Sequence, residues 1–364
     1  MAVRIAHVVG ARPNYMKIAP IMREIGAAGT GFEQFLVHTG QHYDSALSDV
    51  FLDELGLPEP NVNLGVGSGS HAKQTAEIMT RFDEVIDDIR PDWVVVPGDV
   101  NSTLAAALVA VKRGIPVAHV EAGLRSRDLT MPEEVNRLLV DRISDLLLTP
   151  SRDAGDNLRA EGVDDRRIRF VGNLMIDSLV RLLPAAEARW PALQELIRTD
   201  RYVAVTLHRP RNVDDPQSFA VIQAALHEIA KDIDVVFPMH PRTRARSGAE
   251  LRSSKRLRIL EPLGYLDFLA LQAHASAVLT DSGGIQEETT WLGVPCLTLR
   301  QATERPVTIS EGTNQLVPLE TAAIVAAVSE AVERERKTMR VPELWDGRAA
   351  ERVVVALQSV ISKS

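Results

Sequence analysis

Short, nearly continuous apolar runs alternate with longer amphipathic segments along most of the chain. Runs rich in Val, Ile and Leu are typical of strands that are buried on both faces of a sheet. In the first half such strands are predicted at VRIAHVVG, FEQFLVHTG, PDWVVVPGD, IPVAHVEAG and DLLLTPS. Helices are predicted between them, from about Asn14 to Ala28, Ser45 to Leu55, Ser102 to Arg113 and Pro132 to Ile143. The alternation indicates an α/β fold with a parallel sheet covered by helices.

The same rhythm pauses after Arg169 and then begins again. The second set of predicted strands is YVAVTLHR, DIDVVFPMH, RLRILEP, SAVLTDSGG and VPCLTLR. This repetition predicts two Rossmann-like domains, residues 1–172 and 173–345. A last helix, within residues 346–364, is expected to pack back on the first domain.

The composition fits a folded protein of this size. The chain has 364 residues, of which 45% are hydrophobic and 25% charged, enough for two ordinary domains. The net charge of −8 argues against general binding to nucleic acid or to an anionic membrane. An anionic ligand therefore needs a local cationic pocket.

Several common devices are missing from the sequence. A single cysteine, Cys296, excludes an internal disulfide framework and suits a reducing cytoplasm. No signal peptide and no apolar run of membrane-spanning length is recognised, so we expect a cytoplasmic protein without a membrane segment. The first strand is not followed by a dinucleotide fingerprint, and no P-loop, metal-binding motif or G-x-S-x-G elbow occurs. We expect neither a metal nor a dinucleotide cofactor.

Two segments are candidates for binding an anion. At the end of the first strand, Arg12 and Lys17 lie beside a predicted helix start; the alternative is two surface charges on a solvated helix. In the segment AVLTDSGGIQEETTW, a strand runs into Asp281 and a helix is expected to begin near Ile285. Glycines let a backbone approach a ligand closely, and the N–H groups of a helix start point at an anion. The predicted phosphate loop comprises Ser282, Gly283 and Gly284, with Glu288 either capping the helix or binding a ribose diol.

Three carboxylates fall at the same predicted edge of the first sheet, namely Asp99, Glu121 and Glu133. Helix capping would also explain Asp99, and the helix dipole would explain Glu133. Glu121 follows an apolar strand directly and has no such structural explanation. Clustered carboxylates can raise one another's pKa and divide acid and base duties.

His208 and Arg209 end the first strand of the second half, with Arg211 close by. A histidine at such a strand end can transfer a proton or donate to a phosphate. For His119 and His240 the default interpretation is a satisfied structural histidine.

The motifs GARPNYMKIAP, TGQHYD, GDVNST, HVEAGLRS, MPEEVNR, HR at 208–209 and DSGGIQEE are spread over most of the chain. In order and spacing they resemble the non-hydrolysing UDP-N-acetylglucosamine 2-epimerase family. The resemblance implies the GT-B architecture, with two Rossmann-like domains and the nucleotide sugar in the cleft. It also implies a cytoplasmic homodimer that serves cell-surface polysaccharide biosynthesis.

The activity that the resemblance implies is epimerisation at C2, converting UDP-N-acetylglucosamine to UDP-N-acetylmannosamine. Similar enzymes eliminate UDP in anti fashion, form a 2-acetamidoglucal intermediate and add UDP again, without a cofactor. Matching positions assign acid/base roles to Asp99, Glu121 and Glu133, and an essential role to His208. Substrate-binding roles fall on Arg12 and Lys17 near the diphosphate, Arg209, Phe268 at the uracil, the loop Ser282, Gly283 and Gly284, and Glu288 at the ribose.

The chain departs from the family pattern in several places. It reads HRPRN where well-known bacterial members read HRREN, so that Arg211 replaces an acid, and the loop before Glu133 is two residues shorter. TGQHYD and FLDELGLPEP are more similar to the branch acting on UDP-2,3-diacetamido sugar uronates. Residues of an allosteric substrate site are matched in part, by Gln41, His42, Gln74 and His240, whereas Lys73 replaces an arginine.

Four functions therefore stay open. The first is the epimerase of UDP-N-acetylglucosamine, and the second is an epimerase of a 2,3-diacetamido uronate, whose C6 carboxylate Arg211 would pair. The third is a GT-B glycosyltransferase, and the fourth is a catalytically idle sensor of sugar nucleotides. The three carboxylates count against the last two.

Overall fold

The computed structural model describes residues 2–29, 31–40, 52, 54–239, 243–244, 254–334 and 341–361. The chain divides into two compact units. Unit 1 comprises Met1–Ser178 and Glu343–Ser364, and unit 2 comprises Leu179–Pro342. The division falls within a long helix, α7 (Leu174–Ile197).

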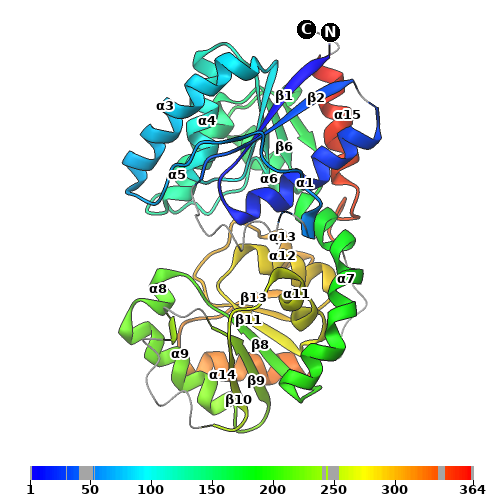
Figure 1. Cartoon of the computed structure of the whole chain (residues 1–364). Helices are drawn as coiled ribbons and strands as arrows, with labels where there is room; N and C mark the ends of the chain where they lie inside the picture. Colours follow the sequence, from blue (N-terminus) through cyan, green and yellow to red (C-terminus); the bar gives the residue numbers. More distant parts are fainter. Residues whose placement is uncertain are drawn as a thin grey trace. The chain divides into compact units, whose positions relative to one another are not determined.

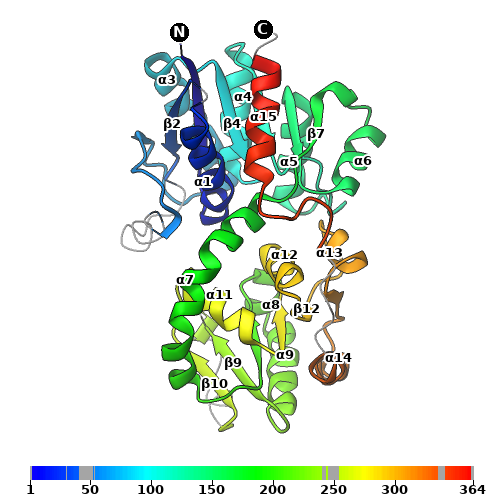
Figure 2. The same cartoon turned by 90° about the vertical axis from the view of Figure 1, so that its right-hand side faces the viewer.

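Unit 1 is built on a seven-stranded sheet of described residues in the order β3-β2-β1-β4-β5-β6-β7, with every pairing parallel. Figures 1 and 2 show α3, α4 and α5 as one layer against this sheet, with α1 and α15 packed together on the other face. The strands are β1 (Val3–Val9), β2 (Phe32–His38), β3 (Val62–Asn63), β4 (Trp93–Pro97), β5 (Val117–Val120), β6 (Leu146–Thr149) and β7 (Ile168–Phe170). The helices are α1 (Arg12–Ala27), α3 (His71–Ile89), α4 (Asn101–Lys112), α5 (Pro132–Ile143), α6 (Arg152–Ala160), the short η1 (Asp165–Arg167) and α15 (Ala349–Ile361).

Unit 2 repeats this plan with six described strands in the order β10-β9-β8-β11-β12-β13, again all parallel. Helices α9 and α14 pack against each other, and so do α11 and α12 (Figure 1). The strands are β8 (Tyr202–Thr206), β9 (Asp234–Pro238), β10 (Leu257–Leu260), β11 (Ala277–Thr280), β12 (Cys296–Thr298) and β13 (Asn314–Leu316). The helices are α8 (Pro210–Val213), α9 (Pro216–Ile229), α11 (Tyr265–His274), α12 (Gly283–Leu292), α13 (Val307–Ser310) and α14 (Thr321–Glu333).

The prediction of two parallel α/β sheets is confirmed. The apolar runs form the central strands, and β4, β5, β6 and β11 are buried along their whole length. Such strands have no solvent face, which is why they read as continuous apolar runs rather than alternating ones. Cys296 is buried in β12, where desolvation raises the pKa of its thiol to about 11.

The C-terminal segment is anchored in unit 1 by specific polar contacts. Both carboxylate oxygens of Asp177 accept from the first turn of α15, at 3.0 Å from the Ala349 N–H and 2.7 Å from the Ala350 N–H. The buried Trp345 donates its indole N–H to the Pro150 carbonyl at 2.9 Å. The α15 helix thereby completes the core of unit 1. Within the described chain, every helix is too short or too polar to cross a bilayer.

Candidate functional site

The turn after β1 leads into the helix that carries Lys17, one of the two candidate cations of unit 1. Asn14 accepts from the backbone N–H groups of Gly10 and Ala11 at 3.1 and 3.0 Å, and donates to the Pro97 carbonyl at 3.0 Å. It therefore joins the end of β1 to the end of β4. One turn later, the side chain of Lys17 points to the same sheet edge, where a Cβ on Gly98 would lie 3.1 Å from its Nζ.

Glu121 lies at the end of β5 and forms a buried ion pair with Lys17. Both side chains are only 8% exposed. The backbone of Glu121 has φ of +69°, a left-handed conformation that costs a residue with a side chain on the order of 1–3 kcal/mol. The Glu121 N–H donates to the Leu148 carbonyl, which holds this turn in place. In this conformation the carboxylate lies beside Lys17 at the sheet edge.

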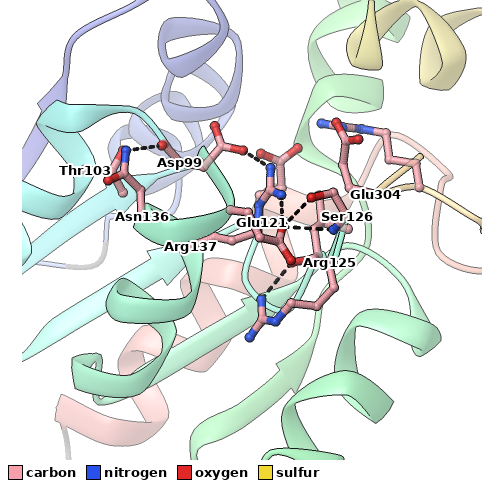
Figure 3. A network of polar contacts seen from close by, with 12 residues as sticks. Asp99, Thr103, Glu121, Arg125, Ser126, Asn136, Arg137 and Glu304 are labelled. Atoms are coloured by element: carbon pink, nitrogen blue, oxygen red, sulfur yellow. Dashed lines mark hydrogen bonds and ion pairs between the residues drawn. The ribbon is translucent and has the colours of Figure 1, made fainter. Parts of the chain in front are cut away.

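Asp99, which follows β4, takes part in a second ion-paired group. The guanidinium of Arg137 on α5 contacts the carboxylate of Asp99 (Figure 3). It also contacts the carboxylate of Glu134. Glu134 also accepts from the backbone N–H groups of Ser126 and Arg127 at 2.9 and 2.8 Å. Burial would raise the pKa of Glu134, but these donors and Arg137 hold it below its usual value. Asp99 stays partly open to solvent, with 26% of its side chain exposed.

Behind these two turns lies a buried network centred on Asp141. His119 on β5 has Nδ1 2.7 Å from Asp141 Oδ1 and Nε2 2.7 Å from the Gly98 carbonyl. Asp141 Oδ2 accepts from Arg125 at 2.6 Å and from the Gly123 N–H at 3.1 Å. Burial would raise the pKa of Asp141, but His119 and Arg125 hold it below its usual value. The network ties the turn before Asp99 to the turn after Glu121.

Both His119 ring nitrogens lie within hydrogen-bond distance of an oxygen, one of Asp141 and one of the Gly98 carbonyl. His119 is thus a satisfied buried histidine, in keeping with its default interpretation. It nevertheless supports the site, because its two bonds reach the segments that carry the candidate carboxylates.

The remaining predicted residues of unit 1 lie at the margins of this arrangement. Glu133 begins α5 and is half-buried, and its neighbour Glu134, rather than Glu133, joins the network of Arg137. Arg12 is exposed at the start of α1. Asp99 does not cap α4, whose N-cap residue Val100 has no side-chain cap. The structure therefore brings together Lys17 with Glu121, and Asp99 with Glu134.

In unit 2, the carboxylate of Asp281 organises the strand ends. Asp281 follows β11 and is fully buried. It accepts from the backbone N–H groups of His208 and Arg209 at 3.1 and 3.0 Å, and from the Asn212 amide at 3.0 Å. Its Oδ1 also lies 3.1 Å from His208 Nδ1. Burial would raise the pKa of Asp281, but the His208 side chain and these donors lower it.

His208 is therefore held by an acid while its imidazole remains 62% exposed. Arg209 donates from Nε to the Asp281 carbonyl at 3.0 Å. A buried carboxylate that orients an accessible imidazole is a common arrangement for proton transfer or for donation to an anion.

The predicted phosphate loop opens helix α12. The helix begins at Gly283, so the expectation of a start near Ile285 was wrong by two residues, and both glycines belong to its first turn. The Ser282 side chain does not cap the helix. A Cβ on Gly283 would lie 2.6 Å from Arg305 Nη1 and 3.0 Å from Glu304 Oε1. A side chain at this position would therefore have to displace the end of the Arg305 side chain.

Arg305 is a functional candidate that the sequence motifs did not identify. It is buried, and its guanidinium contacts Glu304 at 2.5 Å and Glu287 at 2.9 Å. Burial would raise the pKa of Glu304, but Arg305 and Arg300 hold it well below its usual range. The backbone N–H groups of the helix start suit a phosphate, and Arg305 lies beside them, paired with two acids. The segment TERP at 303–306 gave no strand-end pattern that would have marked it.

Glu288 lies in the second turn of α12 and is buried. It accepts from the Gln272 amide at 2.8 Å and from the Tyr265 hydroxyl at 3.1 Å. Burial nevertheless raises the pKa of Glu288 to about 7. Phe268 is half-buried on α11, the helix that supplies both donors. A carboxyl with this pKa can accept or donate a hydrogen bond near neutral pH.

Some expectations fall outside the described residues, namely Gln41, His42 and His240. Gln74 is described and donates to the Gly67 carbonyl at 3.3 Å, while Lys73 is exposed on α3. In the part of the chain that the structure describes, His, Cys, Asp and Glu side chains form no group of three or more suited to a metal ion.

Comparison with known proteins supplies an independent result. A family model described as UDP-N-acetylglucosamine 2-epimerase matches residues 25–358. The chain is 40% identical over 361 residues to a UDP-N-acetylglucosamine 2-epimerase of Methanocaldococcus jannaschii, covering 96% of this chain and 98% of the relative. It is also 40% identical over 320 residues to a UDP-2,3-diacetamido-2,3-dideoxy-D-glucuronate 2-epimerase of Pseudomonas aeruginosa, covering 86% of this chain and 88% of the relative.

Among solved structures, the crystal structure of the M. jannaschii enzyme in complex with UDP-GlcNAc and UDP superposes with a TM-score of 0.90 at 40% identity. It covers 98% of this chain and 100% of the other. The glycotransferase of kitacinnamycin superposes with a TM-score of 0.58 at 14% identity, over 100% and 99% of the two chains, and so shares the fold. The predicted GT-B fold class is confirmed by these superpositions together with the two parallel sheets.

Proposed function

This chain belongs to the UDP-N-acetylglucosamine 2-epimerase family, and we propose that it interconverts UDP-N-acetylglucosamine and UDP-N-acetylmannosamine as a non-hydrolysing isomerase. The observation that carries the proposal is the ion-paired Glu121 at the edge of the unit 1 sheet. Its strained backbone and buried partner are typical of a side chain that is positioned for chemistry.

The proposed reaction begins with removal of the C2 proton by a carboxylate. The electron pair of the C–H bond forms the C1–C2 double bond of a 2-acetamidoglucal, and the pair of the C1–O bond leaves with UDP. The oxygen of UDP then adds again to C1 while a proton reaches the other face of C2. Two acid/base groups are needed, one for each face, and no electrons are exchanged with a cofactor.

We assign these proton transfers to Asp99, Glu121 and Glu133, with His208 assisting UDP. The location of Asp99 and Glu121 at one sheet edge supports their assignment, and the imidazole exposed beside Asp281 supports that of His208. The assignment of Glu133 rests on the family pattern. Its neighbour Glu134 is the one that contacts Arg137.

We assign UDP binding to unit 2. The first turn of α12, with Ser282, Gly283 and Gly284, would hold the diphosphate together with Arg209 and Arg305. Glu288 would bind the ribose, and Phe268 the uracil. Arg12 and Lys17 of unit 1 would neutralise charge on the departing UDP. The division of these roles between two domains is part of the same proposal, as are a homodimer and a cytoplasmic location.

One assay tests the function. The protein is incubated with UDP-N-acetylglucosamine in deuterated water, and C2 is followed by NMR. Incorporation of deuterium at C2 with appearance of the manno epimer is expected. Absence of both with an enzyme that binds UDP would overturn the proposal. Light scattering on the same sample measures the molar mass and tests the dimer.

A specific observation favours a second substrate. The Pseudomonas relative is named for a diacetamido glucuronate, and Arg211 is an exposed cation three residues from His208. A cation there would pair with a C6 carboxylate. Deuterium exchange with the diacetamido uronate, but not with UDP-N-acetylglucosamine, would identify this substrate instead.

A further inference from the structure

Gln286, at the end of the first turn of α12, is a buried polar residue to which the assignments above give no role. It has no exposed surface. Its Nε2 donates to the Ser282 carbonyl at 3.2 Å, while its Oε1 accepts from the Thr303 hydroxyl at 2.7 Å and from the Asn314 amide at 2.9 Å. One side chain therefore joins the start of the helix, the segment before α13 and strand β13.

The Thr303 hydroxyl extends this connection to Arg305. It accepts from the Arg305 N–H at 3.1 Å while it donates to Gln286. The same segment is held again by Thr308, whose hydroxyl donates to the Arg305 carbonyl at 2.7 Å. Arg305 is the residue whose guanidinium lies beside Gly283. Gln286 and Thr303 thus fix the first turn of α12 and the neighbouring segment to each other.

An amide side chain suits the position of Gln286 because it has both a donor and an acceptor and carries no charge. The Ser282 carbonyl requires a donor, whereas the Thr303 hydroxyl and the Asn314 amide require an acceptor. The reverse orientation of the amide would place Oε1 against the Ser282 carbonyl, so that two acceptors would face each other. A glutamate would do the same and would add a buried charge.

The first turn of α12 is more accessible than the side chains behind it. Ser282, Gly283 and Gly284 are half-buried, whereas Gln286 is fully buried. The first N–H groups of a helix have no acceptor within the helix and can therefore bind an anion. The Ser282 backbone is held on both sides, since its N–H donates to the Thr280 hydroxyl at 3.0 Å and its carbonyl accepts from Gln286. The turn that can meet a ligand is thus held by side chains that lie behind it.

We propose that Gln286 and Thr303 are positioning residues for the diphosphate of UDP. They do not contact the ligand but hold the N–H groups of Gly283 and Gly284 in the arrangement that binds phosphate. Donors that are ordered before the ligand arrives avoid the entropic cost of ordering them during binding. The inference rests on the proposed function, which places the diphosphate at this turn, and adds two residues to it.

A pair of substitutions at Thr303 separates its hydroxyl group from its shape. Thr303→Val removes the hydroxyl and keeps the shape of the side chain, whereas Thr303→Ser keeps the hydroxyl. The matched control is Thr321→Val, at another half-buried threonine of unit 2, whose hydroxyl donates to the Val221 carbonyl at 3.2 Å. Gln286→Met removes all three hydrogen bonds of the central side chain. If that variant does not fold, the threonine variants decide the test.

The measurement compares UDP with uridine, which lacks the diphosphate. Affinity for UDP is measured by calorimetry, and affinity for uridine by ligand-observed NMR. Thr303→Val is expected to lower the affinity for UDP about tenfold and that for uridine by about twofold at most. Gln286→Met should lower the affinity for UDP at least as much as Thr303→Val does. Thr303→Ser should recover most of the affinity for UDP, and Thr321→Val should bind both ligands as the wild type does.

A general disturbance of unit 2 would weaken the binding of both ligands alike. Equal losses for UDP and uridine in Thr303→Val would therefore overturn the inference. An unchanged affinity of Thr303→Val for UDP would do the same, and so would a failure of Thr303→Ser to recover it.

The deuterium-exchange assay keeps the two proposals apart. If UDP and uridine respond as expected but the wild type exchanges no deuterium with either candidate sugar, the positioning role stands and the proposed epimerase activity fails. If the wild type exchanges deuterium and Thr303→Val binds UDP as the wild type does, the positioning role alone is wrong.

Discussion

The two units have the same parallel-sheet plan but differ in the polar groups at the ends of their strands. At the edge of unit 1, charged side chains face one another: Glu121 pairs with Lys17, and Asp99 with Arg137. At the edge of unit 2, one buried carboxylate, Asp281, accepts from backbone N–H groups and fixes the course of the chain. Ion-paired side chains can gain and lose protons, whereas the first turn of α12, which follows Asp281, presents backbone N–H donors that do not titrate. The first arrangement suits acid/base chemistry and the second suits an anchor for phosphate.

Amide substitutions of the unit 1 carboxylates should have the largest effect, which is on the rate of C2 deuterium exchange. Asp99→Asn and Glu121→Gln keep the shape of each side chain but remove its ability to take a proton. We expect C2 deuterium exchange to fall about 10³-fold or more in each variant. The affinity for UDP, measured by calorimetry, should change less than threefold because unit 2 provides the anchor. A variant that retains exchange would remove its residue from the assigned role.

The network behind the unit 1 carboxylates should be the next most sensitive feature. Asp141→Asn removes the buried carboxylate that pairs with Arg125 and contacts His119, and breaking a buried pair costs about 3–5 kcal/mol. We expect urea unfolding to show a loss of that order. The matched control is Glu161→Gln, which removes the other partner of Arg125 but at a side chain that is 40% exposed. That change should cost about 1 kcal/mol or less. Equal losses in the two variants would contradict the assigned importance of Asp141.

These two experiments probe features that the sequence revealed to different degrees. Asp99, Glu121 and Asp281 could be located from sequence because each ends an apolar run, and parallel strands bring their carboxyl ends to one edge. The side chains that pair with them could not be located from the sequence. Lys17 and Glu121 are 104 positions apart, and their pairing depends on β1 and β5 both lying beside β4. Periodicity does not encode that order.

Asp141 illustrates a second reason for failure. It lies in the last turn of α5, where a charged residue is ordinarily a solvated one, yet it is buried against His119. Glu133 and Glu134 show a third: two adjacent acids at one helix start cannot be told apart until the rotation of the helix is known. The structure turns Glu134 inward to Arg137. The motif residues could be identified from the sequence, but the direction of their side chains depends on how the helices pack.

Glu288 offers a test of the unit 2 anchor through pH. Its folded pKa of about 7 lies above the ordinary value of 4.5, because burial penalises the charge. Between these values, the unfolded chain releases a proton that the folded chain retains, so this group lowers stability as pH rises. The loss is complete above pH 7 and amounts to about 3 kcal/mol at most. Glu288→Gln should therefore be more stable than the wild type at pH 8 and nearly equal to it at pH 4, by urea unfolding.

Glu304 provides the control for that experiment, because its contribution to stability changes with pH in the opposite direction. Arg305 and Arg300 hold the pKa of Glu304 well below its usual range, although burial alone would raise it, so its contribution is present at neutral pH and is lost on acidification. Glu304→Gln should lower stability at pH 8. If Glu288→Gln shows the same difference from the wild type at both pH values, the neutral form of Glu288 is not what the fold favours. Weaker binding of UDP by Glu288→Gln would support its role at the ribose.

The smallest expected effect concerns the glycine that admits Arg305 to the helix start. A Cβ on Gly283 would meet Arg305 Nη1 at 2.6 Å, so Gly283→Ala must displace the guanidinium or the first turn of α12. We expect the affinity for UDP to fall about tenfold, corresponding to about 1.4 kcal/mol. The maximal rate of C2 exchange at saturating substrate should change less than threefold, because the unit 1 carboxylates are untouched. Gly264→Ala is the matched control, since Gly264 also precedes a helix of unit 2 but its added Cβ would approach only Asp267, at 3.7 Å. A loss of maximal rate in Gly283→Ala without a loss of UDP affinity would mean that the loop takes part in the chemistry, and the contrast between a reactive unit 1 and an anchoring unit 2 would be wrong.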